Sequence, residues 1–314
     1  MAEYSLEAKP THSRWDNSLP SRLTIAPGDV VHMDCLDSSG GQVRPGMTVA
    51  EFLEIDRGLI HALTGPIQIE GAQSGDVLEV KVLEVEHLGW AWTSVIPGLG
   101  FLDERFTEPY LFHWKLEGDV TRSLAPAVVP LDPFCGVMGV AQAQAGEFRT
   151  RPPGAFGGNM DVKELRTGAT LYLPVQVPGA LFSAGDAHAA QGDGEVCING
   201  MECPVHVLLQ FQLHKGQSLA GPMVEAPARA AAEDHGAWMV VESAEDALSA
   251  AKAATSRMVD LLVSEWGFES VQAYLLCSVA MDLKLSQVVN RPMTTVSASI
   301  AKHVLPPRKL FARR

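Results

Sequence analysis

The chain has 314 residues, of which 46% are hydrophobic, and a formal net charge of −13 at neutral pH. This length and composition allow a sizeable core, in one large domain or two ordinary ones. The 24 basic residues are scattered among 37 acidic ones, which argues against a nucleic-acid partner because phosphate-backbone binding depends on clustered Lys and Arg. The basic cluster at 308–314 is typical of a solvated tail.

The apolar runs are too short for a membrane protein. None reaches the roughly 18–20 residues that a span requires, and residues 1–17 lack the apolar stretch of a signal peptide. We therefore expect a cytoplasmic protein with no membrane partner. The five cysteines are irregularly spaced without a C-x-x-C pair, so neither a disulfide framework nor a thiolate zinc site is indicated.

The first part of the chain has the pattern of a β protein. Residues 22–90 alternate apolar and polar positions between Pro-Gly and Ser-Gly breaks. Residues 91–135 hold aromatics and prolines without a clear period, and they predict an ordered excursion over the surface that lines a cleft. Strand-like sequence returns at 126–141, and a glycine-rich turn follows at 151–165.

The last hundred residues change character. A helix is predicted after Ser243 as N-cap, with Gly267 as its C-terminal stop. A second helix is predicted from Ser270, and residues 293–302 predict a closing strand. The chain is therefore expected to be mainly β with a C-terminal α+β part: residues 1–220 would form the core that carries the motifs, and residues 221–314 would pack on that core. His235 and Trp238 are candidates for a pocket wall, although a histidine at a strand start is usually just accommodated.

Residues 184–197, AGDAHAAQGDGEVC, place many polar side chains directly after an apolar run. In an extended strand Asp186 and His188 are two positions apart and project to one face. Asp193 and Glu195 are related in the same way beyond a glycine turn. Four ionisable groups would then converge. An imidazole with carboxylates suits a divalent metal of the zinc type, and a further unligated carboxylate can serve as base toward a bound water.

Turn formation is the competing explanation for this segment. Asp-Gly and Gly-Asp pairs are common turn formers, and an isolated histidine is more often a satisfied polar residue than a ligand. The density of polar residues favours a site, because seven of the ten residues from 186 to 195 are Asp, His, Gln, Gly or Glu. A hairpin needs only one polar turn.

A second candidate is FGGNMD, residues 156–161. Its paired glycines, Gly157 and Gly158, let the backbone approach a ligand closely. Asn159 can donate to an oxygen, and Asp161 can accept from an amide or bind a metal. A Gly-Gly turn with the asparagine as a helix N-cap explains the segment equally well.

A third candidate is HMDCLDSSGG, residues 32–41. Asp34 and Asp37 precede a tight Gly-Gly turn. Their carboxylates would complete a metal shell, or they would simply shape the loop.

Long segments of the chain combine these motifs. GGNMD and GDAHAAQGDGE both lie within residues 152–203, DCLDSSGGQV is followed by residues 61–85, and residues 273–304 run from AYLLCSVAMD to SIAKHV. Together they resemble the acetamidase/formamidase family of amide hydrolases, and the similarity extends over most of residues 20–305.

The resemblance implies hydrolysis of a short linear carboxamide, such as formamide or acetamide, to the carboxylate and ammonia. It also implies a β-sandwich core of jelly-roll type, association with copies of the same chain, and a divalent metal, zinc or calcium. On this basis the expected metal ligands are His188, Asp186, Asp161 and Asp37. The expected catalytic residues are Glu195, Asp193, Asn159 and Gln191.

The substrate is expected to contact Phe156, Gly157 and Gly158. Phe156 stands where the family often has a histidine or another polar residue, which implies a more apolar pocket. In the mechanism we expect, a metal polarises the amide carbonyl and activates water, Glu195 moves the proton to the leaving nitrogen, and Asn159 stabilises the oxyanion. Two alternatives stay open: a non-catalytic β-sandwich whose acidic loops hold calcium, and a hydrolase of another C–N bond such as a cyclic amide.

Overall fold

The computed structural model describes residues 1–125, 127–228 and 236–308. His235 and most of the terminal basic cluster lie outside the described residues. Within those ranges, no helix combines the length and the hydrophobicity that crossing a bilayer demands.

Nine strands form the larger sheet, in the order β1, β4, β16, β6, β14, β17, β18, β20, β19. In that order they span Glu3–Leu6, Val30–Cys35, Val205–His214, Val77–His87, Thr170–Pro174, Met223–Ala226, Ala237–Ala244, Thr294–Ala301 and Met281–Gln287. All pairs are antiparallel except β1 with β4. The long strand β6 buries alternate residues over most of its length, as a strand with one face on a core should.

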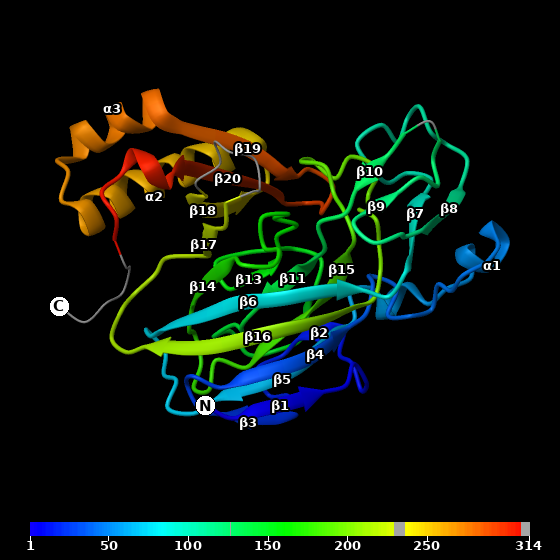
Figure 1. The fold of residues 1–314 in the computed structure, drawn as a ribbon, viewed down its shortest axis with the longest axis horizontal. Coiled ribbons are helices and arrows are strands. Elements are labelled where there is room, and N and C mark those ends of the chain that lie inside the picture. The colour runs from blue at the N-terminus through cyan, green and yellow to red at the C-terminus, as the bar shows by residue number, and fades with distance from the viewer. Residues whose placement is uncertain (126, 229–235, 309–314) are drawn as a thin grey trace.

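Five strands form the second sheet, in the order β13, β11, β15, β5, β3. In that order they span Gly157–Asn159, Phe134–Gly139, Phe182–His188, Leu63–Ile69 and Leu23–Ile25. This sheet lies against β4, β16, β6 and β14 of the larger one (Figure 1). Side chains from both sheets fill the space between them, and the rings of Phe182 and Phe211 meet edge to face at 5.2 Å. The expected β-sandwich is therefore confirmed.

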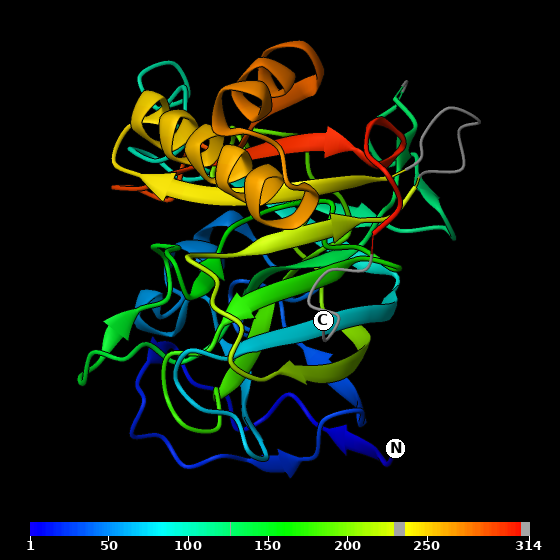
Figure 2. The same ribbon diagram turned by 90° about the vertical axis from the view of Figure 1, so that its left-hand side faces the viewer.

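Two helices cover the C-terminal half of the larger sheet: α2 (Ala247–Trp266) and α3 (Ser270–Ala280) (Figure 2). The buried face of α2 repeats every four residues, which is the spacing of one helix stripe, at Ala250, Ala254, Met258 and Leu262. These side chains pack with residues of β18 and β20 in a second core. Burying a side chain the size of methionine or leucine stabilises the fold by about 1.5–3 kcal/mol.

The predicted start of the first helix is wrong. Ser243 lies in β18, where its hydroxyl pairs with that of Thr295 at 3.0 Å, and Asp246 caps the helix by accepting from the Ser249 N–H at 2.8 Å. The reason is that β18 stays paired with β20 through Ala244. The predicted stop is confirmed, because Gly267 has the left-handed φ of 74° that ends α2. The second helix and the closing strand are confirmed as well.

The region predicted to be irregular, 91–135, partly forms two small two-stranded sheets, so that prediction is wrong in part. Trp90–Val95 (β7) pairs with Tyr110–Lys115 (β8), and Val120–Thr121 (β9) pairs with Val129–Pro130 (β10). Trp92 and Leu111 pack with the short helix α1 (Val49–Leu53) in a third hydrophobic cluster. Burial of these two side chains stabilises the β7–β8 pair in which they lie. The remaining short elements are Arg14–Trp15 (β2), Phe148–Arg149 (β12), Arg57–Leu59 (η1) and Lys302–Val304 (η2).

The larger sheet is continuous across the predicted boundary at residue 220. Strand β14 comes from the earlier part of the chain and pairs with β17 from the later part. The turn between β19 and β20 reaches back toward the end of β15 (Figure 1), and Gly194 forms a parallel bridge with Gln287 there. The C-terminal part therefore contributes to the region that carries the polar motif.

The packing of α2 on the sheet generates a stability prediction. Met258 is fully buried, so Met258→Ala leaves a cavity and should lower the free energy of unfolding by about 3 kcal/mol. Leu248 on the same helix is 65% exposed, and Leu248→Ala should change it by less than about 0.5 kcal/mol. Denaturant unfolding of both variants checks this. A loss of stability in Met258→Ala as small as that in Leu248→Ala would mean that the Met258 face of α2 adds no stability.

Candidate active site

Strand β15 carries the centre of the site into the interior. All seven residues of Phe182–His188 are buried, because β15 is an inner strand of its sheet and both of its faces are covered. The pairing with β5 ends at Gly185, and the next residue, Asp186, adopts a left-handed φ of 53°. Asp186 and His188 lie together at the polar end of an otherwise apolar strand, as the sequence predicted.

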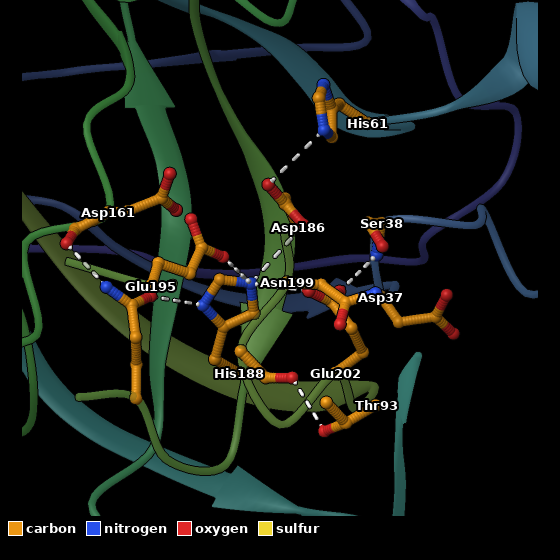
Figure 3. Close-up of polar contacts among 12 residues, drawn as sticks. Asp37, Ser38, His61, Thr93, Asp161, Asp186, His188, Glu195, Asn199 and Glu202 are labelled. Carbon is orange, nitrogen blue, oxygen red and sulfur yellow. Dashed lines mark hydrogen bonds and ion pairs between the residues drawn. The ribbon is translucent and has the colours of Figure 1, made fainter. Parts of the chain in front are cut away.

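His188 is fully buried and surrounded by carboxylates (Figure 3). Its Nε2 lies 2.9 Å from Glu202 Oε1, 3.5 Å from Asp186 Oδ1 and 3.9 Å from Glu195 Oε1. Burial alone would lower the pKa of His188, but Glu202 and Asp186 hold it well above its ordinary value. One imidazole nitrogen therefore faces three acids in a space sheltered from water.

Gln191 determines how the imidazole is protonated. Its Nε2 donates to the carbonyl oxygens of Asp161 at 2.9 Å and Ser286 at 3.3 Å, so its Oε1 is the atom that faces His188 Nδ1 at 2.9 Å. An amide oxygen only accepts, and the proton must therefore be on Nδ1. The lone pair of a neutral His188 is then on Nε2, directed at the carboxylates, as in a metal ligand whose second nitrogen is held by an outer partner.

Asp161 approaches from the turn after β13. Asn290 Nδ2, from the turn between β19 and β20, donates to its Oδ2 at 2.5 Å. The other carboxylate oxygen of Asp161, Oδ1, is buried without a hydrogen-bond partner among the described residues. Burial raises the pKa of Asp161 to about 7, and the charge of Asp186 acts in the same direction. The space beside this oxygen depends on Gly136, where a Cβ would lie 2.5 Å from Asp161 Oδ1.

Asp37 and Glu202 lie at the side of the cluster. Glu202 Oε2 accepts from the Ser38 N–H at 2.9 Å, and Asp37 Oδ1 accepts from the Ser39 N–H at 2.7 Å. Burial raises the pKa of Asp37 to about 7 despite its bonds to Ser39, and the charge of Glu202 adds to the effect. Asp37 and Glu202 are each only 1% exposed. Asp37 is therefore close enough to Glu202 and Asp186 for their charges to disfavour its ionised form.

The cluster has the chemistry of a cation site. One ligand atom each from Asp161, Asp186 and His188 lie within 4.8 Å of one another, and the same holds for His188, Glu195 and Glu202. Buried oxygens without hydrogen-bond partners, among the described residues, occur at Asp37, Asn159, Asp161, Asp186 and Glu195. Burial and the charge of Asp161 hold the pKa of Glu195 well above its ordinary value. A divalent cation would relieve this repulsion and satisfy the oxygens, so the residues fit such an ion.

Backbone strain is concentrated at the same place. Of the seven non-glycine residues with positive φ in the described ranges, five are at the site: His61, Asp161, Asp186, Glu195 and Ile198. Left-handed conformations are uncommon for residues other than glycine and persist only where the surroundings enforce them. The backbone is therefore bent to aim these side chains inward.

A cavity of about 340 Å³ opens over the cluster. Its polar wall includes Asn159, Asp161, Asp186, Glu195 and Glu202. Its other wall is apolar and comes largely from the N-terminal loops and the 96–99 loop: Ile55, Ile60, Trp92, Ile96 and Leu99. The cavity can hold a small molecule with one polar end against the acids and an apolar body.

Two of the expected residues are separated by the structure. Asp193 and Glu195 do not share a face, and the expectation of an extended segment there is wrong. Gly194 and Glu195 have left-handed φ values of 96° and 48°, so the chain turns between them. Glu195 points into the cluster, whereas Asp193 pairs with Lys163 at 2.7 Å with its side chain 37% exposed.

The other segment expected to contact substrate lies behind the cavity. Phe156 packs in the core, with its ring 5.3 Å from that of Trp15. Gly157 and Gly158 are in β13, paired with β11, and the residues of the 156–161 segment that line the cavity are Asn159 and Asp161. Asn159 therefore belongs to a strand, and the N-cap alternative does not apply.

Sequence reasoning missed three residues of the site. Glu202 forms a bridge with His188 across adjacent backbone segments, His61 Nε2 lies 3.9 Å from Asp186 Oδ2, and Asn290 binds Asp161. His61 helps to hold the pKa of Asp186 below its ordinary value, although burial acts against this. Each lies outside the dense motif, so local composition carries no signal for it.

The sequence is similar to a known protein family and to named members of that family. The profile of the acetamidase/formamidase family matches residues 2–147 and 142–306. The chain is 26% identical to the acetamidase of Mycolicibacterium smegmatis over 353 aligned positions, which span 86% of this chain and 85% of that protein. It is 29% identical to the formamidase of Methylophilus methylotrophus over 244 positions, which span 60% of each protein.

A solved structure is similar over nearly the whole length. The acetamidase of Bacillus halodurans superposes with a TM-score of 0.88 at 32% identity, covering 96% of this chain and 98% of that one.

The crowding at Gly136 generates a prediction about the cluster. In Gly136→Ala the new methyl would also lie 2.9 Å from the Asp186 carbonyl oxygen and 3.1 Å from His188 Cε1. Overpacking of this kind should lower the free energy of unfolding by about 2 kcal/mol. Gly192→Ala is the matched control, because nothing lies within 4 Å of its added Cβ. Denaturant unfolding that shows equal stability for the two variants would contradict the close packing around Asp161.

Proposed function

Since the chain belongs to the acetamidase/formamidase family and is a hydrolase of linear amides, we propose that the cavity over His188 is its active site. The reaction is hydrolysis of a short linear carboxamide, in which R–CO–NH2 and water give R–COO⁻ and NH4⁺. The observation that supports this most is the buried convergence of Asp161, Asp186 and Glu195 on one imidazole, at the wall of a cavity.

The proposal includes a divalent metal ion held by Asp161, Asp186 and His188. The first two carry buried oxygens without hydrogen-bond partners among the described residues, and Gln191 leaves His188 Nε2 free to ligate. An imidazole in the set favours zinc over calcium, which takes oxygen ligands. When bound, such an ion supplies a Lewis acid that polarises the amide carbonyl and lowers the pKa of a neighbouring water.

Glu195 is the proposed general base. It lines the cavity, and its Oε2 is buried without a hydrogen-bond partner among the described residues. Its carboxylate takes a proton from the attacking water as the new C–O bond forms, and it returns that proton to nitrogen as the C–N bond breaks. Both transfers are needed because an amide nitrogen is a poor leaving group until it is protonated.

Three neighbours support these steps. The Asn159 side chain lines the cavity and makes no hydrogen bond to other described residues, so its amide N–H is available to the developing oxyanion. Gln191 holds Nδ1 of His188 and is a positioning residue, and Glu202 places a further carboxylate 2.9 Å from Nε2. Asp37 lies behind Glu202 and adjusts the charge of the cluster. Asp193, Phe156, Gly157 and Gly158 have no assigned step here, because none of them lines this cavity.

The proposal extends to organisation and location. Self-association is supported by a group of apolar side chains in and after the 96–109 loop that are 49% to 60% exposed: Phe101, Leu102, Phe106 and Tyr110. Packing of residues 221–314 with residues 1–220 as one unit is supported by the pairing of β14 with β17. A cytoplasmic location and the absence of a nucleic-acid partner are supported by the composition.

The base assignment predicts opposite outcomes for two nearby carboxylates. Glu195→Gln should lower kcat for ammonia release by about a hundredfold or more, because general acid–base catalysis contributes at least that much. Asp193→Asn should keep activity close to that of the unchanged protein, because its carboxylate pairs with Lys163 at the surface. Steady-state kinetics on acetamide would check both; a Glu195→Gln variant with nearly full kcat excludes Glu195 as the base.

Metal removal tests the ion separately. Dialysis against a chelator should abolish ammonia release, and added Zn²⁺ should restore it. Metal analysis of the dialysed protein gives the occupancy, and a thermal scan shows whether the chain is still folded. A metal-free protein that keeps full activity and only melts at a lower temperature would mean that the ion is structural.

A further inference from the structure

A second cavity, of about 490 Å³, adjoins the active-site cavity. The two share Arg57, Ile60, His61, Leu99 and Arg151 in their walls, so they are immediate neighbours. The outer cavity is lined by five arginines, Arg14, Arg57, Arg149, Arg151 and Arg291, and we call it the arginine vestibule. No acidic residue of the described ranges lines it, although the chain as a whole carries a net charge of −13.

Most of these arginines have no acidic partner. Among the described residues, Arg14, Arg57, Arg149 and Arg151 form no ion pair with any carboxylate, whereas Arg291 pairs with Asp103 at 3.2 Å. Arg14 donates to the carbonyl oxygen of Ser13 at 2.7 Å, and Arg57 stacks over the Phe52 ring at 5.0 Å. In a chain with this excess of acids, that lack of pairing is unusual.

The arginines are held close enough to repel one another. The antiparallel pairing of β2 with β12 sets Arg14 directly opposite Arg149, and like charges in opposed positions destabilise a strand pair. Burial lowers the pKa of Arg151, and the charge of Arg149 lowers it further. Burial and Arg151 act in the same way on the pKa of Arg57. A bound anion would remove this repulsion.

Charge balance with the catalytic acids explains only part of the arrangement. The pKa of Arg151 does respond to Asp186 and Glu195, so this side chain is partly a counter-charge to the cluster. Arg14 and Arg149, however, line the vestibule and not the inner cavity. Their position corresponds to the far end of a molecule whose amide lies against Asp186.

We propose that the substrate is a linear carboxamide that carries a carboxylate at the other end of its chain. The amide lies in the inner cavity, a short apolar spacer passes Ile60 and Leu99, and the carboxylate is bound in the vestibule by Arg149 with Arg57 and Arg151. Guanidinium groups bind carboxylates through two parallel N–H···O bonds, which gives geometry as well as charge. The inference rests on the proposed function and names the substrate class of that same site.

The test compares two amides of similar shape and different charge. Succinamate has a carboxylate where neutral 4-methylpentanamide has an isopropyl group. We expect kcat/KM for ammonia release to be at least about tenfold higher for succinamate at low ionic strength. Added salt should reduce the difference, because it screens the vestibule charges.

Variants assign the difference to the vestibule. Arg149→Gln should lower kcat/KM for succinamate by about tenfold, mostly through KM, and leave that for 4-methylpentanamide unchanged. Arg149→Lys should recover part of the loss. Arg122→Gln is the charge-matched control, since Arg122 is exposed and lines neither cavity. The melting temperature of Arg149→Gln should not fall, because the substitution removes a repulsion.

Three results would overturn the inference. Equal or better turnover of 4-methylpentanamide would exclude an anionic substrate, and the proposed function would stand. An equal loss on both amides in Arg149→Gln would make that arginine structural and exclude it as the anion site. Ammonia release from neither amide, nor from acetamide, would remove the proposed function and this inference together.

Discussion

The structure depends on placing one imidazole and several carboxylates together in its interior, at the wall of a cavity. Burying an unpaired charge is costly, and a buried group of like charges is stable only with opposite charge and hydrogen bonds around it. At His188 the Glu202 carboxylate lies beside Nε2, and the Gln191 side-chain oxygen lies beside Nδ1. The same demand accounts for Gly136, where a side chain would displace the Asp161 carboxylate, and for the left-handed backbone at Asp186.

Local sequence patterns predict much of the fold and part of the site. Alternation of apolar and polar residues predicts the strands, and the helix ending at Gly267 follows from its period and its stop signal. Dense polar sequence at the end of an apolar run is the signal that predicts Asp186 and His188. The prediction is wrong for Asp193, because left-handed residues turn the chain where strand geometry would have to continue, and the Asp193 side chain pairs with Lys163 instead.

The residues that sequence reasoning missed are brought in by strand topology. Glu202 and Asn290 each lie in ordinary local sequence, and the fold brings them to the cluster. Glu202 bridges His188 from the segment before β16, and Asn290 reaches Asp161 from the turn between β19 and β20. The Ser243 error has the same origin, since pairing of β18 with β20 overrides a good local helix start. Patterns within a short window report local conformation, and a single sequence contains no independent measure of which windows meet.

The contact from Asn290 to Asp161 joins the final strand pair to the motif near the middle of the chain. Asn290 is 129 residues further along the chain than Asp161. Local opening of the turn between β19 and β20 would therefore remove the hydrogen-bond partner of the Asp161 carboxylate. The order of this polar centre is in this way tied to the stability of a strand pair that lies far from it in the sequence.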